Sequence, residues 1–462
     1  MKQDKPPKLK RKGHWLRRIG WTLATLILLL ALFHRPLVFR GTKYLLVRLA
    51  KEQKLDLSYD ISGSIFTTLT VVNLHAKPTE PGPVERLEVG TLNLRYSLVG
   101  LIRKGLPGLL KDLDLRDAYV VVDPAKSVPR EKAVKEQKGA KFPALFPERV
   151  NLQNINFISR SPTGDTELAG LYFNLDPVVP GVLKIKTLNI PGVRKWDGIA
   201  AGATFRDRDL VLSDLALGPE IALKRLYLNA SKLDADEVTL GLDGVLFGAP
   251  TTLAVKVTDL NETNRFNVRM QLAGLSFDAA TAYLHLTLPL HGMLTRATII
   301  FDGVPDRPNT WAGKIETQLD ALAFDKQALG AVSAQIDLGN GRATVAVGNR
   351  FDARNSIALN ADAALPETLD GFVKTSASGR HEVKAPDLAT ITKALPLTAD
   401  GDLSARVDFK LNDGQMNARV AIDSARLAAA GAELMKTHIA MDVEKNIAAN
   451  AQPVFADLVT QT

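Results

Sequence analysis

Residues 265–272 read RFNVRMQL, and apolar and polar side chains alternate through them one by one. Every second residue from Phe266 to Leu272 is apolar, and the three between them are asparagine, arginine and glutamine. Successive side chains of a β-strand point to opposite faces, so this period of two predicts a strand with one apolar face and one wet face. The stretch therefore predicts a sheet with an apolar surface on one side.

The same alternation recurs at residues 92–96, 238–242, 315–319, 357–361 and 407–411. Turn-forming residues separate the predicted strands, with examples at 207–209, 217–219, 243–244, 339–341 and 412–414. Strands recur roughly every 10 to 15 residues, which is typical of an antiparallel meander. We expect an all-β fold, a long curled antiparallel sheet with few short helices. Its apolar face must be covered, either as the dry core of a sandwich or solenoid or as the lining of an open, taco-like groove.

Few segments have helical spacing. A short helix is predicted over 43–53, and residues 99–113 form an amphipathic pattern interrupted by a Pro-Gly pair. Two further short helices belong to an internal similarity, whose copies open at Asp278 and at Asp387. In each copy an Ala/Thr/Leu-rich stretch and then Leu-Pro-Leu follow the Asp, and a Gly stands at the same distance from it, at Gly292 and at Gly401. Such fixed spacing indicates units that stack on their neighbours; a chance match of two helix-loop segments is the alternative.

The positive charge is concentrated at one end of the chain. The 462 residues carry a net charge of +8, and the first 18 hold eight basic side chains against one acid, which gives this tail +7. The other 444 residues hold 50 basic and 49 acidic side chains, or +1. A neutral body lacks the electrostatic footprint of a nucleic-acid partner. With 46% apolar residues and no Cys, the chain is neither disordered nor a disulfide scaffold.

A membrane anchor is predicted directly after the basic tail. Residues 19–33, IGWTLATLILLLALF, carry no charge, and this stretch is somewhat short for a bilayer core that takes about 20 residues. A cleaved signal peptide is the alternative, but no small-x-small site follows. We expect an uncleaved signal anchor over 19–39, with the tail in the cytoplasm and the body outside, in the periplasm of a bacterium.

One segment departs from the alternating pattern. Residues 123–148 hold four prolines and, between Lys126 and Lys141, six basic side chains. We expect a solvated, Pro-rich basic loop there; a docking segment for an acidic partner or lipid headgroups is the alternative.

No catalytic or metal-binding constellation is recognisable, so we expect no enzyme activity, no cofactor and no catalytic residue. His285 and His291 are the only close His pair, and they lack an acid at a ligand-like spacing in the sequence. Asp112, Asp114 and Asp117 lie close together in the sequence, and the first two alternate with Leu113 and Leu115, which is typical of the polar face of a strand rather than of an acid/base pair. Residues 339–341, Gly-Asn-Gly, are better explained by a hairpin turn than by a phosphate loop.

Several segments together resemble the AsmA-like/TamB-like envelope proteins. They are the short anchor, residues 61–66 (ISGSIF) leading to 69–74 (LTVVNL), residues 85–101 (ERLEVGTLNLRYSLVGL), and 113–122 closing on Asp-Pro. The repeats at Asp278 and Asp387 resemble the repeating segments of the same family. The resemblance covers most of the chain, although its motifs are loose patterns without fixed chemistry.

The resemblance implies an inner-membrane protein whose periplasmic sheet curls into an apolar groove and carries phospholipids between the inner and outer membranes. An assembly factor for outer-membrane proteins, with an outer-membrane protein as partner, is the alternative that the family also offers. About 30 strands at roughly 4.8 Å spacing would extend about 140 Å, and the C-terminal assembly domain of the family is not recognisable. The predicted parts are a cytoplasmic tail (1–18), the anchor (19–39), an N-terminal β domain (40–122), the basic loop (123–148) and a repetitive groove (149–462).

The side chains expected to line this groove and contact lipid are the alternating apolar sets. They are Leu92, Leu94, Val238, Leu240, Leu242, Phe266, Val268, Met270, Leu272, Ile315, Leu319, Ile357, Leu359, Val407, Phe409 and Leu411.

Overall fold

The computed structural model describes residues 55–64, 67–80, 82–105, 108–126, 146–260, 263–325, 327–392, 399–429 and 431–446. The predicted tail, anchor and helix over 43–53, and most of the basic loop, lie outside the described residues. Within the described part, no helix is both long and apolar enough to cross a membrane.

The fold is one open, mainly antiparallel sheet of 23 strands with a few short helices. The predicted all-β class is therefore confirmed. The chain divides into two compact units, one up to Asn174 and one from Leu175. The first unit contains β1 (Leu55–Gly63), β2 (Thr68–Pro78), β3 (Val84–Tyr96), α2 (Leu98–Lys104), β4 (Leu110–Val122), η2 (Pro124–Lys126), β5 (Arg149–Ser159) and most of β6 (Thr166–Leu175).

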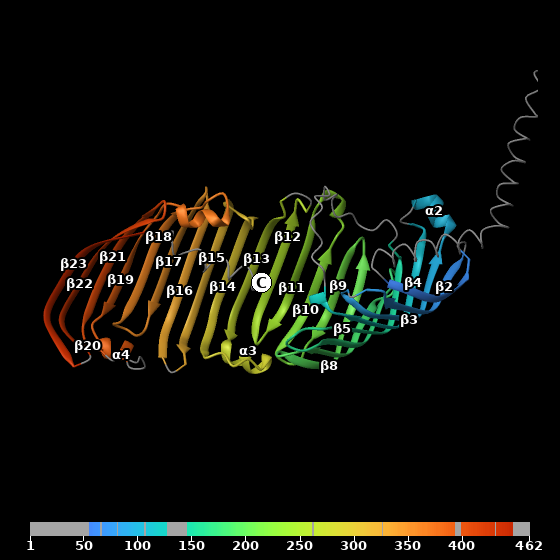
Figure 1. Cartoon of the computed structure of the whole chain (residues 1–462), viewed down its shortest axis with the longest axis horizontal. Helices are drawn as coiled ribbons and strands as arrows, with labels where there is room; N and C mark the ends of the chain where they lie inside the picture. Colours follow the sequence, from blue (N-terminus) through green and yellow to red (C-terminus); the bar gives the residue numbers. More distant parts are fainter. Residues whose placement is uncertain are drawn as a thin grey trace, which may run out of the picture. The chain divides into compact units, whose positions relative to one another are not determined.

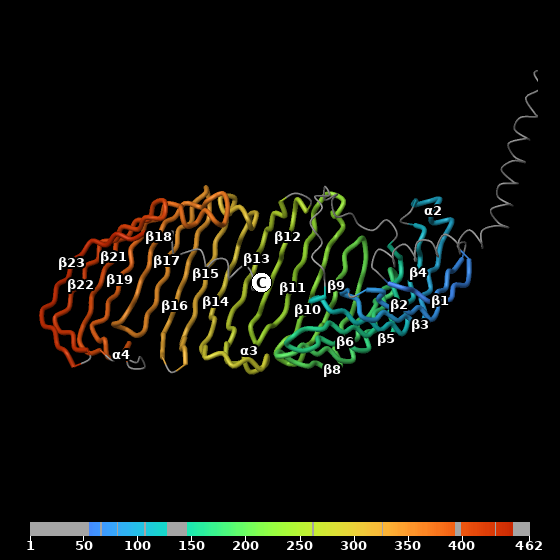
Figure 2. Tube along the Cα trace, in the orientation of Figure 1, coloured from blue at the N-terminus to red at the C-terminus, as the bar shows by residue number. Residues whose placement is uncertain are grey.

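The strands of the second unit follow one another in chain order, as Figures 1 and 2 show, except that β19 pairs with β21 and the short β20 pairs with β22. They are β7 (Gly181–Ile190), β8 (Arg194–Arg206), β9 (Asp209–Ala216), β10 (Ile221–Asn229), β11 (Val238–Leu246), β12 (Ala249–Thr258), β13 (Arg265–Ser276), β14 (Leu290–Val304), β15 (Arg307–Phe324), β16 (Gln327–Gly339), β17 (Arg342–Arg350), β18 (Ser356–Ala364), β19 (Ala377–Ala385), β20 (Ala399–Gly401), β21 (Leu403–Asn412), β22 (Gln415–Ala429) and β23 (Ala432–Asn446). Its helices are η3 (Leu233–Ala235), α3 (Phe277–Leu284), η4 (Leu369–Lys374) and α4 (Leu388–Thr392).

The expectation of a purely antiparallel sheet is wrong at one place, where β4 and β5 pair in parallel. A parallel pair needs a crossover of a dozen or more residues to bring the chain back to its starting edge. The segment 123–148 supplies that length. Most of this segment lies outside the described residues, and its length is sufficient for such a connection.

Most predicted turns are confirmed. Asn340 and Gly341 both have positive φ, 52° and 67°, and form the two-residue turn between β16 and β17. The turn predicted at Asp243-Gly244 is wrong, because both residues lie inside β11. A Cβ on Gly244 would stand 2.4 Å from the Ala222 carbonyl oxygen, where β10 bulges toward it. Gly244 therefore allows the backbones of β10 and β11 to approach each other closely, and it does not form a turn.

The helix predicted over 99–113 is shorter than expected. α2 ends at Lys104 before Gly105, which has a φ of 70°, and β4 already begins at Leu110. The Asp residues at 112 and 114 therefore lie on a strand, as their alternation with leucine predicts. α3 and α4 lie in the two segments of the predicted internal similarity, and the matching Gly292 and Gly401 have similar positive φ values of 121° and 111°.

Helix α3 bridges several strands of the second unit at one end. Its Tyr283 is buried; the hydroxyl accepts a hydrogen bond from Trp196 Nε1 at 2.5 Å and donates one to the Leu217 carbonyl oxygen. Arg194 donates to the Tyr283 carbonyl oxygen at 2.8 Å, and its guanidinium lies 4.1 Å from the Tyr283 ring centroid. The helix that follows β13 is thereby fixed to β8, across the ends of the strands between them.

Candidate functional site

The apolar residues of the second unit line up from strand to strand. One row of mutually paired residues crosses fourteen strands, from β9 to β23 with only the short β20 left out, and contains no polar side chain. We call it the central row; it consists of Leu212, Leu226, Leu242, Leu253, Met270, Ile299, Ile315, Ile336, Val345, Ala361, Gly379, Phe409, Ala418 and Val443. At about 4.8 Å per strand it extends roughly 60 Å.

Parallel rows widen this apolar face on both sides. One row runs through Leu240, Val268 and Phe301 and remains apolar or glycine as far as Met416. The row on the other side starts at Leu272 and is interrupted by Thr317 and His381.

The structure brings fourteen of the sixteen predicted lining residues onto this one face of the second unit. The central row holds Leu242, Met270, Ile315 and Phe409; the row of Val268 holds Leu240, Val268 and Leu411; the row of Leu272 holds Leu272, Leu359 and Val407; and Val238, Phe266, Leu319 and Ile357 lie in rows further out. Leu92 and Leu94 belong to the first unit, where β3 pairs them with Leu115 and Leu113 of β4.

Sequence reasoning missed several members of the central row, among them Leu253, Ile299 and Ile336. Ile299 stands in the run Thr-Ile-Ile-Phe, where apolar residues on both faces hide the period of two. Only the register with β13 and β15 assigns Ile299, and not Ile300, to the row of Met270 and Ile315.

The predicted lining residues are neither core nor freely exposed. Of the sixteen, only Leu272 is buried, Leu240 is 43% exposed, and the others are half-buried. A dry core exists at the start of the second unit, where Ile199, Ala201, Leu215 and Leu223 of β8–β10 are buried together. From β12 onward the face is more open, with one small buried cluster of Ala249, Leu272 and Ala297.

Phe409 covers the one glycine of the central row. A Cβ on Gly379 would lie 2.6 Å from the Cζ of the Phe409 ring and 2.6 Å from the Asn360 carbonyl oxygen. The aromatic ring therefore lies against the backbone of the neighbouring strand and fills the place of the missing side chain. The apolar surface remains continuous at this position.

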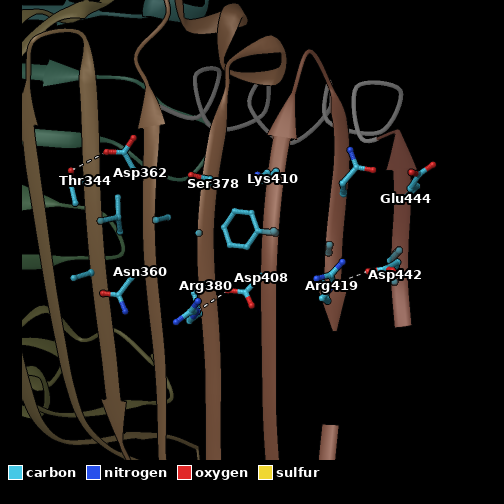
Figure 3. Close-up of a pocket in the computed structure, with 18 residues that line it drawn as sticks. Thr344, Asn360, Asp362, Ser378, Arg380, Asp408, Lys410, Arg419, Asp442 and Glu444 are labelled. Atoms are coloured by element: carbon cyan, nitrogen blue, oxygen red, sulfur yellow. Dashed lines mark hydrogen bonds and ion pairs between the residues drawn. The ribbon is translucent and has the colours of Figure 1, made fainter. Parts of the chain in front are cut away.

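The opposite face of the same strands is polar and carries cross-strand ion pairs. Across strands, Arg380 contacts Asp408 at 2.7 Å and Arg419 contacts Asp442 at 3.2 Å (Figure 3). Within β21, Arg406 also contacts Asp408 at 2.7 Å. Hydrogen bonds from Arg406 and Arg380 lower the pKa of Asp408. A sheet with this pattern has one charged, hydrated side and one apolar side.

A hollow of about 1050 Å³ lies over strands β17, β18, β19, β21, β22 and β23. Both polar rows beside the central row contribute residues from all six strands, whereas the next apolar rows contribute none. Since alternate residues point to opposite faces, the hollow lies on the charged side, with its walls formed by polar side chains such as Asp362, Arg380 and Lys410 (Figure 3). The central-row residues of the same six strands, from Val345 to Val443, also border it.

The described residues contain no group of three or more His, Cys, Asp or Glu side chains placed to hold a metal ion. His291 pairs with Asp278 at 2.5 Å, and both side chains are more than half exposed. This single exposed pair, which the sequence spacing did not predict, is not a metal site.

Comparisons with protein-family models, curated proteins and solved structures found no match for this chain.

Proposed function

We propose that the protein carries phospholipids along the apolar face of its sheet, between the inner and outer membranes of a bacterial envelope. The observation that carries the proposal is the central row, which stays apolar across fourteen strands. A sandwich or solenoid core also has a continuous apolar face, but such a core buries its side chains, and most residues of this face are only half-buried. A ligand that moves along the sheet requires this continuity.

The energetic argument concerns the acyl chains. Exposing a hydrocarbon chain to water costs about 0.8 kcal/mol per CH₂, so a desorbed phospholipid faces a cost on the order of 20 kcal/mol. A continuous apolar lining offsets most of this cost at every position. The half-buried state of the lining residues supports a face that has room for acyl chains, because a dry core buries its side chains.

The proposal includes the curled groove and the membrane location. Acyl chains lie against the apolar face inside the curl, and headgroups project through its open side into water. The segment 19–39 anchors the chain in the inner membrane, with the basic tail in the cytoplasm and the body in the periplasm. The resemblance to the AsmA-like/TamB-like proteins points in the same direction.

Native mass spectrometry of the detergent-extracted full chain tests the proposal directly. We expect co-purified phospholipids. A photo-crosslinking residue at Met270, on the apolar face, should give phospholipid adducts, while the same residue at the neighbouring Arg269 should give few, because Arg269 is exposed on the other face.

Absence of lipid from both experiments would contradict the lipid conduit. Polypeptide adducts at Met270 without lipid adducts would favour the alternative that the resemblance offers, an assembly factor that receives strands of outer-membrane proteins.

A further inference from the structure

Helix α2 in the first unit exposes apolar side chains where a surface helix ordinarily exposes polar ones. Ile102 is 84% exposed, Val99 59% and Leu98 37%. Residues three and four apart are neighbours on a helix, so these three side chains form one patch with Ile102 at its centre. No described residue buries this patch.

The other side of α2 is fixed to the unit and sets this orientation. A Cβ on Gly100 would lie 2.0 Å from the Gly108 carbonyl oxygen, so the two backbones are in direct contact. Ser97 caps the helix by accepting a hydrogen bond from the Gly100 amide at 3.0 Å, and its own amide donates to the Leu109 carbonyl oxygen at 2.8 Å. The helix cannot turn its apolar side inward without losing these contacts.

The sequence in and around α2 is basic. Residues 95–111 contain Arg95, Arg103, Lys104 and Lys111 and no acidic side chain. Arg95 and Lys104 each pair with an acid from outside this segment, Asp112 at 3.3 Å and Glu148 at 3.2 Å. Arg103 and Lys111 form no ion pair with any described residue. Exposed apolar side chains beside unpaired cations are typical of helices that lie in the interface of an anionic bilayer.

We propose that α2 docks on the surface of a membrane that contains anionic phospholipids and inserts Ile102, with Val99 and Leu98, at the level of the headgroups. This inference rests on the proposed membrane attachment through residues 19–39. The anchor holds the chain at the bilayer, and α2 then fixes the first unit against its surface.

The absence of Cys from the chain permits a clean test. In the full chain, Ile102→Cys is labelled with an environment-sensitive fluorophore, and the protein is reconstituted into vesicles of phosphatidylcholine and phosphatidylglycerol. We expect the emission to shift to shorter wavelength and to be quenched by brominated lipid. Ser231→Cys, in an exposed turn of the second unit, is the labelling control and should show neither change. Arg103→Glu together with Lys111→Glu should weaken the quenching at position 102.

Flotation of the same samples separates the two proposals. Protein that floats with the vesicles while the label at 102 keeps its aqueous emission overturns the docking of α2 and leaves the attachment standing. Protein that does not float overturns both. A shifted emission that brominated lipid does not quench means that protein covers the patch, which also overturns the docking.

Discussion

At the scale of one residue, the close contact of Gly379 with the Phe409 ring and the Asn360 carbonyl oxygen predicts that a larger residue at this position destabilises the sheet. Gly379→Ala would place a Cβ 2.6 Å from both the Phe409 ring and the Asn360 carbonyl oxygen, and the carbonyl belongs to backbone that cannot rotate away. We expect a loss of about 1–3 kcal/mol in the free energy of unfolding, as for other overpacked sites. The midpoint of urea unfolding, followed by circular dichroism, measures it.

Gly339→Ala is the matched control for this substitution. Gly339 also lies in a strand, at the end of β16, and a Cβ there would meet no atom within 4 Å. Equal midpoints for the two variants would mean that both the Phe409 ring and the strand carrying the Asn360 carbonyl shift without cost, and that the close contact at Gly379 does not fix the spacing of the strands.

Asp402 predicts a dependence of stability on pH. Its carboxylate accepts hydrogen bonds from the Ala425 amide at 3.0 and 3.1 Å and from the Arg426 amide at 2.9 Å, and these bonds lower its pKa. A carboxyl group whose pKa is lower in the folded state stabilises the fold above the unfolded pKa, and this stabilisation is lost as the pH falls through the folded value.

We therefore expect Asp402→Asn to lower the melting temperature above a pH of about 5, and the difference from the parent chain to shrink as the pH falls below about 4. Asp413→Asn is the control, because Asp413 lies in a turn at a φ of 47° that asparagine adopts equally well. A difference that persists unchanged at pH 2 would show that the charge of Asp402 is not the cause.

At the scale of the elements, α3 depends on the hydroxyl of Tyr283. Tyr283→Phe leaves the Trp196 Nε1–H and the Leu217 carbonyl oxygen without their partner at a site where the ring is only 3% exposed. We expect a cost of about 1–3 kcal/mol in the free energy of unfolding, with tryptophan fluorescence as the readout. Tyr227→Phe is the control, since the Tyr227 hydroxyl makes no hydrogen bond with any described residue. A variant at Tyr283 as stable as this control would mean that α3 is not held by the hydroxyl.

The elements also show how far the sequence predicts the fold. Strands such as β13 and β21 are predictable because each alternates by itself, and the turn at Asn340-Gly341 because its residues favour positive φ. The parallel pairing of β4 with β5 is not predictable, because it depends on where the chain returns after the long crossover 123–148. The bulge in β10 that requires Gly244 is also not predictable from one strand alone, because a bulge depends on how two strands pair.

The sequence predicts that the sheet has an apolar face, but it does not predict how far that face extends. The alternating sets place Met270 and Phe409 on an apolar face, but only the registers place both in one row. Register depends on the sum of many cross-strand contacts, and a slip of one residue would move a whole strand to the other face.

At the scale of the whole molecule, a conduit differs from a set of independent binding sites in one respect: a single block must affect distant positions. Val345 lies in the central row between Met270 and Phe409. Val345→Asp places a charge in the path that we propose for the acyl chains, where an unpaired carboxylate is strongly unfavourable. We expect lipid crosslinks in cells to persist at Met270 or at Phe409 and to be lost at the other, and the position that loses them identifies the downstream end.

Ala346→Asp adds the same charge to the exposed polar face of the same strand and should leave both crosslinks intact. Crosslinks that survive at both positions in a folded Val345→Asp protein would mean that lipids bind the face locally without moving along it.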